Sequence, residues 1–412
     1  MKELMNARKS INPELVITVV GIGGCGCNTI NMLQENGLSE RVNLIAINTD
    51  LAVLKHTDVD KKILIGEDLT SGYGAGADPA VGLKAAQESE ELLKNAIKDS
   101  DVVIITAGFG GGTGTGASPL VASIARDLNI NCLAIVTLPF ESEGQMRMDF
   151  ALDGIKAIKE PVHAYITLSN DLLLQGLGES VGLFSAFNQS NEVLKNLLVA
   201  LVEMLTKTGF QNVDKNDFST ILSYEGESVL GVGKAETEEQ AFDAVDQALN
   251  NPLVSIAKIA TAKGLICQLF FKKEPRLTTY NGLISRIREK ITNPSVLIVP
   301  GVTLDPDLSC EVEVLIIASG IDSTKGVTVK SEEQPIVNQE IEIIPTSHPQ
   351  HYCDDLTFLH DEISMESVID ISEGLDETGN SQPKEGELEY TDIPAITRLM
   401  REKQLRAVKG DV

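Results

Sequence analysis

The sequence lacks the features that identify membrane-spanning and exported chains. It contains no run of about 18 apolar side chains, and its first residues, MKELMNARKSINPEL, hold no apolar stretch typical of a signal peptide. Its six cysteines follow no disulfide framework, and four of them lie in or beside apolar or glycine-rich segments, which favours reduced thiols. We therefore expect a cytoplasmic protein with no transmembrane segment.

Basic side chains are scarce. The chain has 34 Lys and Arg against 60 Asp and Glu, a net charge of −26. Nucleic-acid binding requires a basic surface, so we expect no nucleic-acid partner. The hydrophobic content of 42% is ordinary for a globular protein, and 412 residues are enough for two or more domains with sizeable cores.

What the first half of the chain does contain is a regular alternation of apolar runs and helical patterns. Six runs are typical of strands: LVITVV, NLIAIN, KILIG, DVVIITA, NCLAIVT and AYITLS. Helix-like stretches lie between most of them, for example at 80–98 and 116–128. Continuous apolar runs indicate strands buried on both faces. The pattern predicts an α/β fold with a doubly wound parallel sheet.

The rest of the chain divides by composition. A long helical pattern leads to a mixture of strands and two or three helices, which predicts a second, smaller α+β domain with strands at SVLGVGKA, GLICQLFF, SVLIVPGV and EVEVLIIASGI. Residues 331–390 then hold 16 acidic residues against one basic residue, Lys384. Such a segment cannot bury enough apolar surface to offset its ordering entropy, so we predict a disordered linker. The expected divisions are a flexible extension 1–14, a nucleotide-binding domain 15–180, a central helix 181–210, an α+β domain 211–325, a linker 326–388 and a terminal peptide 389–412.

The first strand leads into a glycine-rich turn, GIGGCGCNTINML. Gly21, Gly23 and Gly26 fit the G-x-G-x-x-G pattern of dinucleotide-binding proteins, and Asp50 follows the next strand, where a ribose-binding acid can lie. An NAD-dependent oxidoreductase is one interpretation of this motif. Tight packing of a strand against a helix is another, and it requires no ligand.

A second glycine run, GFGGGTGTGAS at 108–118, also lies between a strand and a helix. Its amides and the helix N-terminus suit an anion, and the hydroxyls of Thr113 and Thr115 can donate to phosphate oxygens. A third run, GYGAGADP, occupies 72–79. A dinucleotide fold needs one such turn, so three favour a mononucleotide triphosphate. The G-x-x-x-x-G-K-[ST] motif is missing, which excludes a P-loop protein and leaves the phosphates to backbone amides.

The order of these loops resembles the tubulin/FtsZ family of GTPases. GGGTGTG is that family's signature, and it is accompanied by GIGGCGCN, NTD, GAGADP, TLPFESEGQMR, SNDLLL and NVDKND. The resemblance covers about residues 13–321. It implies GTP or GDP as bound nucleotide, with Mg²⁺, and a self-assembling cell-division GTPase that forms head-to-tail filaments and a ring at the division site, near the inner face of the membrane.

The resemblance also assigns roles to residues. Two cysteines replace glycines that the family usually has in its first loop. Glu192 occupies the family's guanine-reading Asp position, where a carboxylate can accept the adjacent N1–H and N2–H donors that adenine lacks. Phe187 matches the residue that stacks on the base, and Glu143 and Arg147 match residues near the ribose and phosphates. The implied nucleotide contacts are Gly24, Cys25, Gly26, Cys27, Asn28, Asp50, Ala75, Gly76, Gly110, Gly111, Gly112, Thr113, Gly114, Thr115, Gly116, Glu143, Arg147, Asn170, Phe187 and Glu192.

The nucleotide loops contain no obvious base for an attacking water. In the family, two carboxylates on the loop after the central helix enter the pocket of the next subunit, and Asp214 and Asp217 match them. Lys215 and Asn216 replace the usual Phe and Ala between them, and Lys215 can pair with a phosphate or with a neighbouring acid. Without the family, a helix cap or turn is the simplest interpretation of this Asp pair. A nucleotide-binding scaffold that does not hydrolyse is therefore a further alternative.

The last residues reverse the charge of the linker. YTDIPAITRLMREKQLRAVKGDV contains five basic residues, with Ile393, Ile396 and Met400 at helical spacing. This pattern favours a short motif that folds on a partner, and a frayed tail is the alternative. DIPAITR resembles the family's terminal peptide, which binds membrane-tethering adaptors, although Ile396 and Thr397 replace the usual Phe and Leu. We assign no metal site. His348, His351 and Cys353 leave zinc in the linker as an alternative.

Overall fold

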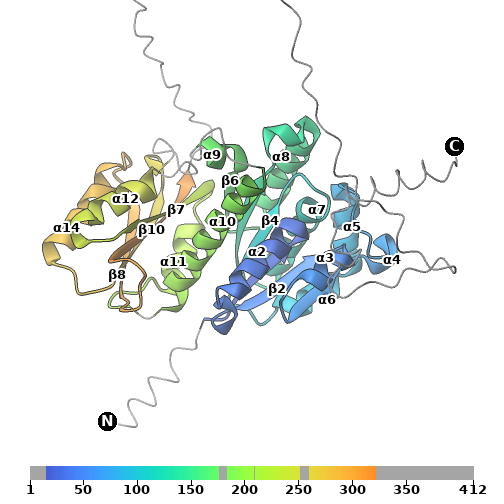
Figure 1. The fold of residues 1–412 in the computed structure, drawn as a ribbon, viewed down its shortest axis with the longest axis horizontal. Helices are drawn as coiled ribbons and strands as arrows, with labels where there is room; N and C mark the ends of the chain where they lie inside the picture. The colour runs from blue at the N-terminus through green and yellow to red at the C-terminus, as the bar shows by residue number, and fades with distance from the viewer. Residues whose placement is uncertain (1–14, 176–182, 208, 251–258, 322–412) are drawn as a thin grey trace, which may run out of the picture. The chain divides into compact units, whose positions relative to one another are not determined.

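The computed structural model describes residues 15–175, 183–207, 209–250 and 259–321 (Figure 1). The six apolar runs of the first half form one parallel sheet with the strand order β3-β2-β1-β4-β5-β6. The strands are β1 Ile17–Ile22, β2 Asn43–Asn48, β3 Lys61–Leu64, β4 Val102–Gly108, β5 Asn131–Leu138 and β6 Ala164–Ser169. The predicted doubly wound parallel sheet is confirmed.

Helices cover both faces of this sheet. Alternate residues of β1 enter two separate cores, Ile17 and Val19 on one face and Val20 and Ile22 on the other. The helices of this part are α2 Gly23–Glu35, α3 Leu51–His56, α4 Glu67–Thr70, α5 Pro79–Glu88, α6 Glu90–Ile97, α7 Thr113–Asp127, α8 Gln145–Lys159 and α9 Asn170–Gln175, with short 3₁₀ turns at Leu38–Glu40 and Glu141–Glu143. Side chains of α5, α6, α7 and α8 fill one core, and those of α2 and α3 enter the other.

The long helix α10, Leu183–Thr206, joins the first sheet to a second one. Figure 1 shows α10 between the two sheets, and buried residues such as Leu197 and Leu201 belong to a core that includes both. The 24 residues of α10 span about 36 Å at 1.5 Å per residue. This helix is slightly shorter than the predicted range of 181–210.

The second sheet is mixed, with the order β7-β10-β8-β9, and only the β8–β9 pair is parallel. Its elements are α11 Lys215–Leu222, β7 Glu227–Ala235, a 3₁₀ turn Glu238–Gln240, α12 Ala241–Leu249, β8 Gly264–Phe271, α14 Leu277–Glu289, β9 Leu297–Leu304 and β10 Val312–Ile321. The four predicted strands all form, so a smaller α+β part is confirmed. The exact domain boundaries stay a prediction.

One predicted helix is interrupted. The stretch 80–98 forms α5 and α6, which are separated at Ser89. The Ser89 side chain is buried, and its hydroxyl accepts a hydrogen bond from the amide of Gly66 at 3.1 Å. This bond ties the junction of α5 and α6 to the segment after β3. None of the helices in the described part of the chain is long and apolar enough to cross a membrane.

Candidate functional site

The glycine runs meet at the carboxyl edge of the first sheet. The strand order reverses between β1 and β4, and open parallel sheets bind ligands at such a switch point. The loop after β1 leads into α2 and the loop after β4 leads into α7. Both therefore lie where the fold favours a ligand.

The loops contact one another closely enough to form a single surface. A Cβ atom on Gly23 would lie 3.0 Å from the amide nitrogen of Gly114, so the loops after β1 and β4 are in contact. A Cβ atom on Gly112 would lie 2.8 Å from that of Ala75, which brings in the third run. The three runs singled out in the sequence thus form one cluster.

Two helices begin at this cluster without side-chain caps. Among the described residues, no side chain bonds the first N–H groups of α2, whose N-cap is Ile22, or of α7, whose N-cap is Gly112. Free N–H groups and the positive end of the helix dipole attract anions. Two such ends in contact provide more N–H donors than a single phosphate needs, which suits a di- or triphosphate.

The glycines divide into packed and open positions. A Cβ on Gly21 would lie 2.3 Å from the carbonyl oxygen of Gly26, and one on Gly116 would lie 2.1 Å from that of Pro79. Close packing within the protein is therefore enough to explain why these two positions are glycine. A Cβ on Gly24 or Gly111 would meet nothing within 4 Å, so packing within the protein does not require glycine there. These two positions fit a ligand that approaches the backbone.

Two of the packed glycines belong to the G-x-G-x-x-G motif of the first loop. Gly21 and Gly26 approach each other where β1 meets α2, and Gly26 also lies against the carbonyl of Thr106 on β4. Two of the three glycines in the motif therefore have a packing role, as the ligand-free interpretation expected. The motif by itself does not point to NAD.

The threonines of the second run hold the cluster together. The Thr113 Oγ1 atom lies 2.7 Å from Thr49 Oγ1, which follows β2, and both residues are buried. The Thr115 hydroxyl accepts a hydrogen bond from the Gly110 amide at 2.9 Å, which closes the loop on itself. An acceptor hydroxyl keeps its proton, so Thr115 can still donate to a ligand.

The two cysteines of the first loop point to different surroundings. The Cys25 Sγ atom lies 3.6 Å from Thr137 Oγ1 at the end of β5. The Cys27 thiol is fully buried and accepts a hydrogen bond from Asn48. Burial raises the pKa of both thiols above the ordinary value, which makes them weak nucleophiles. Asn28, next along α2, is exposed.

Several predicted nucleotide contacts are already bonded within the protein. The Asp50 carboxylate caps α3 by accepting the amides of Ala52 and Val53 at 2.8 and 3.2 Å. Glu143 accepts the Phe140 amide through Oε1 and pairs with Arg147 through Oε2 at 2.7 Å. Asp50 and Glu143 each have only part of their acceptor capacity left for a ligand.

The residues predicted to bind the base lie on α9 and α10. Asn170, at the start of α9, is buried, and its Oδ1 accepts a hydrogen bond from the Ser190 hydroxyl at 2.7 Å, which links α9 to α10. Half of the Glu192 side chain is exposed, and its Oε2 pairs with Lys195 one turn later. Phe187 lies on α10, but its side chain is outside the part of the chain that the structure describes.

The predicted catalytic acids lie at the other edge of the first sheet. Asp214 is the N-cap of α11 and accepts the Asp217 amide through Oδ1 at 2.7 Å, so the cap interpretation is correct. Lys215 pairs with Asp101 at 2.6 Å, just before β4 begins. The seven residues of β4 separate that edge from the second glycine loop by about 23 Å at ~3.3 Å per residue. The structure therefore does not bring the acids to the glycine cluster within one chain.

Thr49, Thr137 and Ser190 belong to the site's framework, yet the sequence did not single them out. Each is a hydroxyl residue that bonds a predicted site residue from another element. Thr49 was detectable, because it lies in the NTD stretch directly after a strand. Thr137 was detectable in the same way, because it begins the TLPFESEGQMR stretch at the end of a strand. Ser190 carries no local signal, since its partner is 20 residues away.

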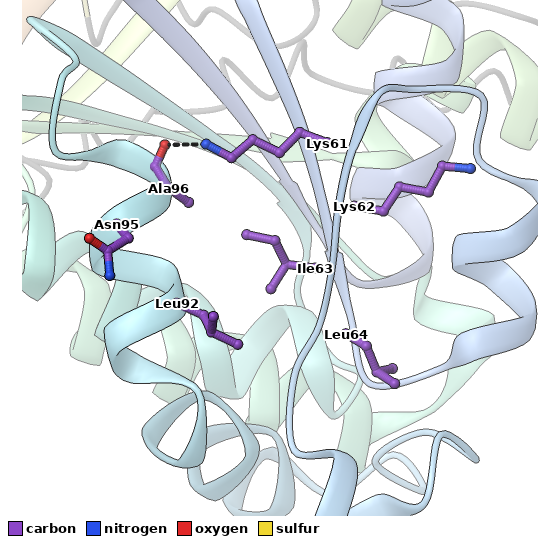
Figure 2. A pocket seen from close by; sticks show the side chains of 7 residues that line it. All are labelled: Lys61, Lys62, Ile63, Leu64, Leu92, Asn95 and Ala96. Carbon is purple, nitrogen blue, oxygen red and sulfur yellow. Dashed lines mark hydrogen bonds between the residues drawn. The ribbon is translucent and has the colours of Figure 1, made fainter.

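A surface groove of about 350 Å³ lies elsewhere, between β3 and α6 (Figure 2). Its lining consists of Lys61, Lys62, Ile63, Leu64, Leu92, Asn95 and Ala96. The Lys61 ammonium donates to the Ala96 carbonyl at 2.8 Å across it. The lining contains no carboxylate, hydroxyl, thiol or imidazole side chain, and it includes none of the site residues predicted from the sequence.

Metal ligation was considered for His348, His351 and Cys353, which are outside the described residues. Within the described ranges there is no cluster of three or more His, Cys, Asp or Glu side chains able to hold a metal ion.

Comparison with known families gives two matches along the chain. Residues 16–178 match the family described as "Tubulin/FtsZ family, GTPase domain". Residues 226–322 match the family described as "FtsZ family, C-terminal domain". The first match contains the glycine cluster, and the second contains the mixed sheet.

Individual relatives agree with these matches. "Cell division protein FtsZ" of Buchnera aphidicola subsp. Baizongia pistaciae is 33% identical over 393 residues, which are 94% of this chain and 97% of that protein. The structure titled "FtsZ dimer, empty (M. jannaschii)" is 38% identical, with a TM-score of 0.72 over 78% of this chain and 92% of that one. CetZ2 from Haloferax volcanii, titled as a GTPγS-bound protofilament, is 18% identical with a TM-score of 0.63 over 75% and 94% of the two chains, which shows a shared fold.

Proposed function

This chain belongs to the tubulin/FtsZ family of GTPases and cell-division proteins, and on that premise we propose that it binds GTP, assembles head to tail and hydrolyses GTP between subunits. The glycine cluster of one subunit holds the nucleotide. Asp214 and Asp217 of the next subunit act on its γ-phosphate.

The observation that carries this proposal is the separation of the two sets of residues. The uncapped ends of α2 and α7 lie at the carboxyl edge of the first sheet, and the contacts of Lys215 lie at its amino edge. Stacking identical subunits places one edge against the other. Such a contact joins two different surfaces and does not close, so it generates a filament. The structures titled as an FtsZ dimer and as a CetZ2 protofilament support self-association of this fold.

Hydrolysis in this arrangement depends mainly on positioning. Phosphoryl transfer needs an aligned water and stabilised charge more than it needs a covalent catalyst. Backbone amides at Gly24 and Gly111, where a Cβ would meet nothing, can approach the phosphates closely. The carboxylates of Asp214 and Asp217 orient the attacking water.

Mg²⁺ fits the site as a partner of the nucleotide. It prefers oxygen ligands, keeps several waters and is usually bound through phosphates together with one or two carboxylates. The described part of the chain holds no carboxylate cluster for it, so phosphate oxygens, with Asp214 or Asp217 of the next subunit, would supply its ligands. Bound there, it would neutralise charge on the phosphates.

Guanine is read by residues on α9 and α10. Glu192 accepts N1–H and N2–H, Asn170 adds a polar contact, and Phe187 stacks on the base. The half-exposed position of the Glu192 carboxylate supports this role, because a ligand can reach it beside its pairing with Lys195.

In the cell, we propose that the filaments form the division ring on the inner side of the membrane and reach adaptors through residues 389–412. That peptide lies outside the described residues. Its separation from the folded part by an acidic segment supports an independent role. Deleting residues 385–412 should leave GTPase activity and assembly largely intact and abolish adaptor capture. Capture at the parental level would contradict the assignment.

Light scattering and phosphate release, measured together against protein concentration with GTP and with ATP, test the proposal. We expect turnover that depends on GTP and rises per molecule above an assembly threshold. Assembly with no phosphate release would instead support a non-hydrolysing scaffold. Tight NAD binding without competition from GTP would favour an oxidoreductase.

A further inference from the structure

Lys215 stands between the two proposed catalytic acids, yet its side chain reaches a distant carboxylate. Its ammonium lies 2.6 Å from Asp101 Oδ1, and the other oxygen, Oδ2, accepts the backbone amide of Val16 at 3.0 Å. Val16 directly precedes β1, and Asp101 directly precedes β4. One ion pair therefore connects the first residue of α11 to the start of two central strands.

A second bond lies one turn further along the helix. Asn131, the first residue of β5, donates through Nδ2 to the Ser219 hydroxyl at 2.6 Å. The same helix buries Phe218, Ile221 and Leu222 in the core that continues into the second sheet. The first turn of α11, which carries the acids, has no such buried contact apart from Phe218. Lys215 supplies the ionic contact of this turn with the first sheet, beside the Asn131–Ser219 bond, whose hydroxyl in turn donates to the Lys215 carbonyl at 2.8 Å.

The segment before α11 is attached to the other sheet. The amide of Gln211 donates to the Val302 carbonyl at 3.1 Å, and the Val302 amide donates back at 2.8 Å. The acids thus lie between an anchor on β9 and an anchor on Asp101. If one of these two contacts were lost, the acids would stay attached to the part of the protein that carries the other contact and could move with it.

The Lys215–Asp101 pair also fixes the position of the positively charged Lys215 ammonium. A lysine next to two acids can neutralise one of them, which would weaken their action on a water or a cation. Here Asp101 holds the ammonium, and this hydrogen bond keeps the pKa of Asp101 below its ordinary value. The side chains of this ion pair are about 45% exposed on the lysine and 36% on the aspartate, so the pair is partly accessible to solvent.

We propose that Lys215 is a positioning residue: paired with Asp101, it holds the start of α11 against the first sheet and keeps its own charge away from Asp214 and Asp217. This inference rests on the proposed function, because it assumes that these acids complete the site of the next subunit. The ion pair then acts on the rate of hydrolysis and leaves nucleotide binding unchanged.

Steady-state GTPase kinetics of four variants test this: Lys215→Met, Lys215→Arg, Asp101→Asn and the double variant Asp101→Asn with Lys215→Met. All rates are taken above each variant's own assembly threshold, and thermal melting verifies folding. We expect Lys215→Met to lower kcat about fivefold, equivalent to about 1 kcal/mol, with KM unchanged. Lys215→Arg should restore most of the rate.

The aspartate variant separates positioning from direct action. Freed from its partner, the ammonium of Lys215 can reach the acids, so Asp101→Asn should lower kcat at least as much as Lys215→Met. The double variant should match Lys215→Met, because removing the lysine removes the misplaced charge. If Lys215 instead contacted the neighbour's phosphates, Asp101→Asn would leave kcat unchanged while Lys215→Met lowered it, and that result would overturn the proposal.

Two controls complete the experiment. Lys156→Met breaks another exposed Lys–Asp pair, with Asp153 at 2.8 Å on α8, and should keep the parental kcat. Asp214→Asn reports on the proposed function itself. A parental rate of GTP hydrolysis in Asp214→Asn would contradict the proposal that the site is shared between subunits. Slow turnover in Asp214→Asn together with parental turnover in Lys215→Met would overturn only the role of Lys215.

Discussion

The hydroxyls of Thr49 and Thr113 lie 2.7 Å apart and join the turn after β2 to the first residue of α7. Both residues are buried, so each hydroxyl depends on the other for a partner. This contact helps to hold the start of α7 where the first and second glycine loops meet. It belongs to the framework of the proposed nucleotide site.

Replacing Thr49 by valine keeps the shape and removes the hydroxyl. We expect the free energy of unfolding to fall by about 1–3 kcal/mol, because the Thr113 hydroxyl loses its buried partner. GTP affinity should fall as well. Thr18→Val is the matched control, since the Thr18 hydroxyl pairs with Ser100 at 2.6 Å at the opposite edge of the sheet. The control should lose stability and keep GTP affinity. Equal GTP affinity in both variants would contradict this role for Thr49.

Gly111 and Gly112 are adjacent, yet alanine should act differently at each. A Cβ on Gly112 would lie 2.8 Å from the Ala75 Cβ and 2.9 Å from the Asp78 amide, so Gly112→Ala should cost about 1–3 kcal/mol of stability by overpacking. A Cβ on Gly111 meets nothing within 4 Å. Gly111→Ala should therefore fold normally and bind GTP roughly ten- to a hundredfold more weakly, through loss of an amide contact to phosphate.

Thermal melting and GTP titration distinguish the two effects. A Gly111→Ala variant that binds GTP as tightly as the parent would show that the open position does not face the nucleotide. A larger side chain at Gly112 would collide with the 75–78 loop before it reached a ligand in the glycine cluster, so its first effect should be on stability.

Selectivity for guanine should depend on Glu192. Glu192→Ala is expected to weaken GTP binding by about 1–3 kcal/mol, because two donors of the base lose their acceptor. ATP binding should change little. Lys195→Met provides the control, since it removes the partner of Glu192 and leaves the carboxylate in place. If competition titrations gave the parent equal affinity for GTP and ATP, the assignment of guanine recognition to Glu192 would be wrong.

Acid should weaken the Lys215–Asp101 contact in a defined direction. The lysine hydrogen bond lowers the pKa of Asp101 below the ordinary value of 3.8. A carboxyl with a lowered folded-state pKa contributes stability that is fully present above the unfolded pKa and is lost as the pH falls through the folded one. In urea unfolding, the stability difference between the parent and Asp101→Asn should be constant from about pH 7 to about pH 5 and shrink below about pH 3.8. A difference that grows on acidification would contradict the pairing.

Much of the fold follows from local patterns in the sequence. The runs NLIAIN and DVVIITA are continuously apolar at 44–47 and 102–105, which indicates strands buried on both faces, and they form β2 and β4. Glycine runs directly after such strands predict a ligand edge, because parallel strands end together. In the structure, the first, second and third glycine runs contact one another.

What the sequence could not indicate are pairings between distant residues. Nothing near Lys215 points to Asp101, which lies 114 residues earlier, and nothing near Ser89 announces its bond to Gly66. The acid pair was equally ambiguous. Asp214 caps a helix, and a cap and a catalytic carboxylate carry the same local signature.

The central claim is that the site is shared between subunits, and mixing two inactive variants tests it most directly. Asp214→Asn keeps an N-cap, because Asn caps as well as Asp, and should bind GTP yet hydrolyse it slowly. Gly111→Ala keeps the acids and should bind GTP weakly. In an equimolar mixture above the assembly threshold, the acids of Gly111→Ala can meet the GTP held by Asp214→Asn, so phosphate release should exceed the mean of the two variants measured alone. Release equal to that mean, from filaments shown to contain both variants, would contradict the account.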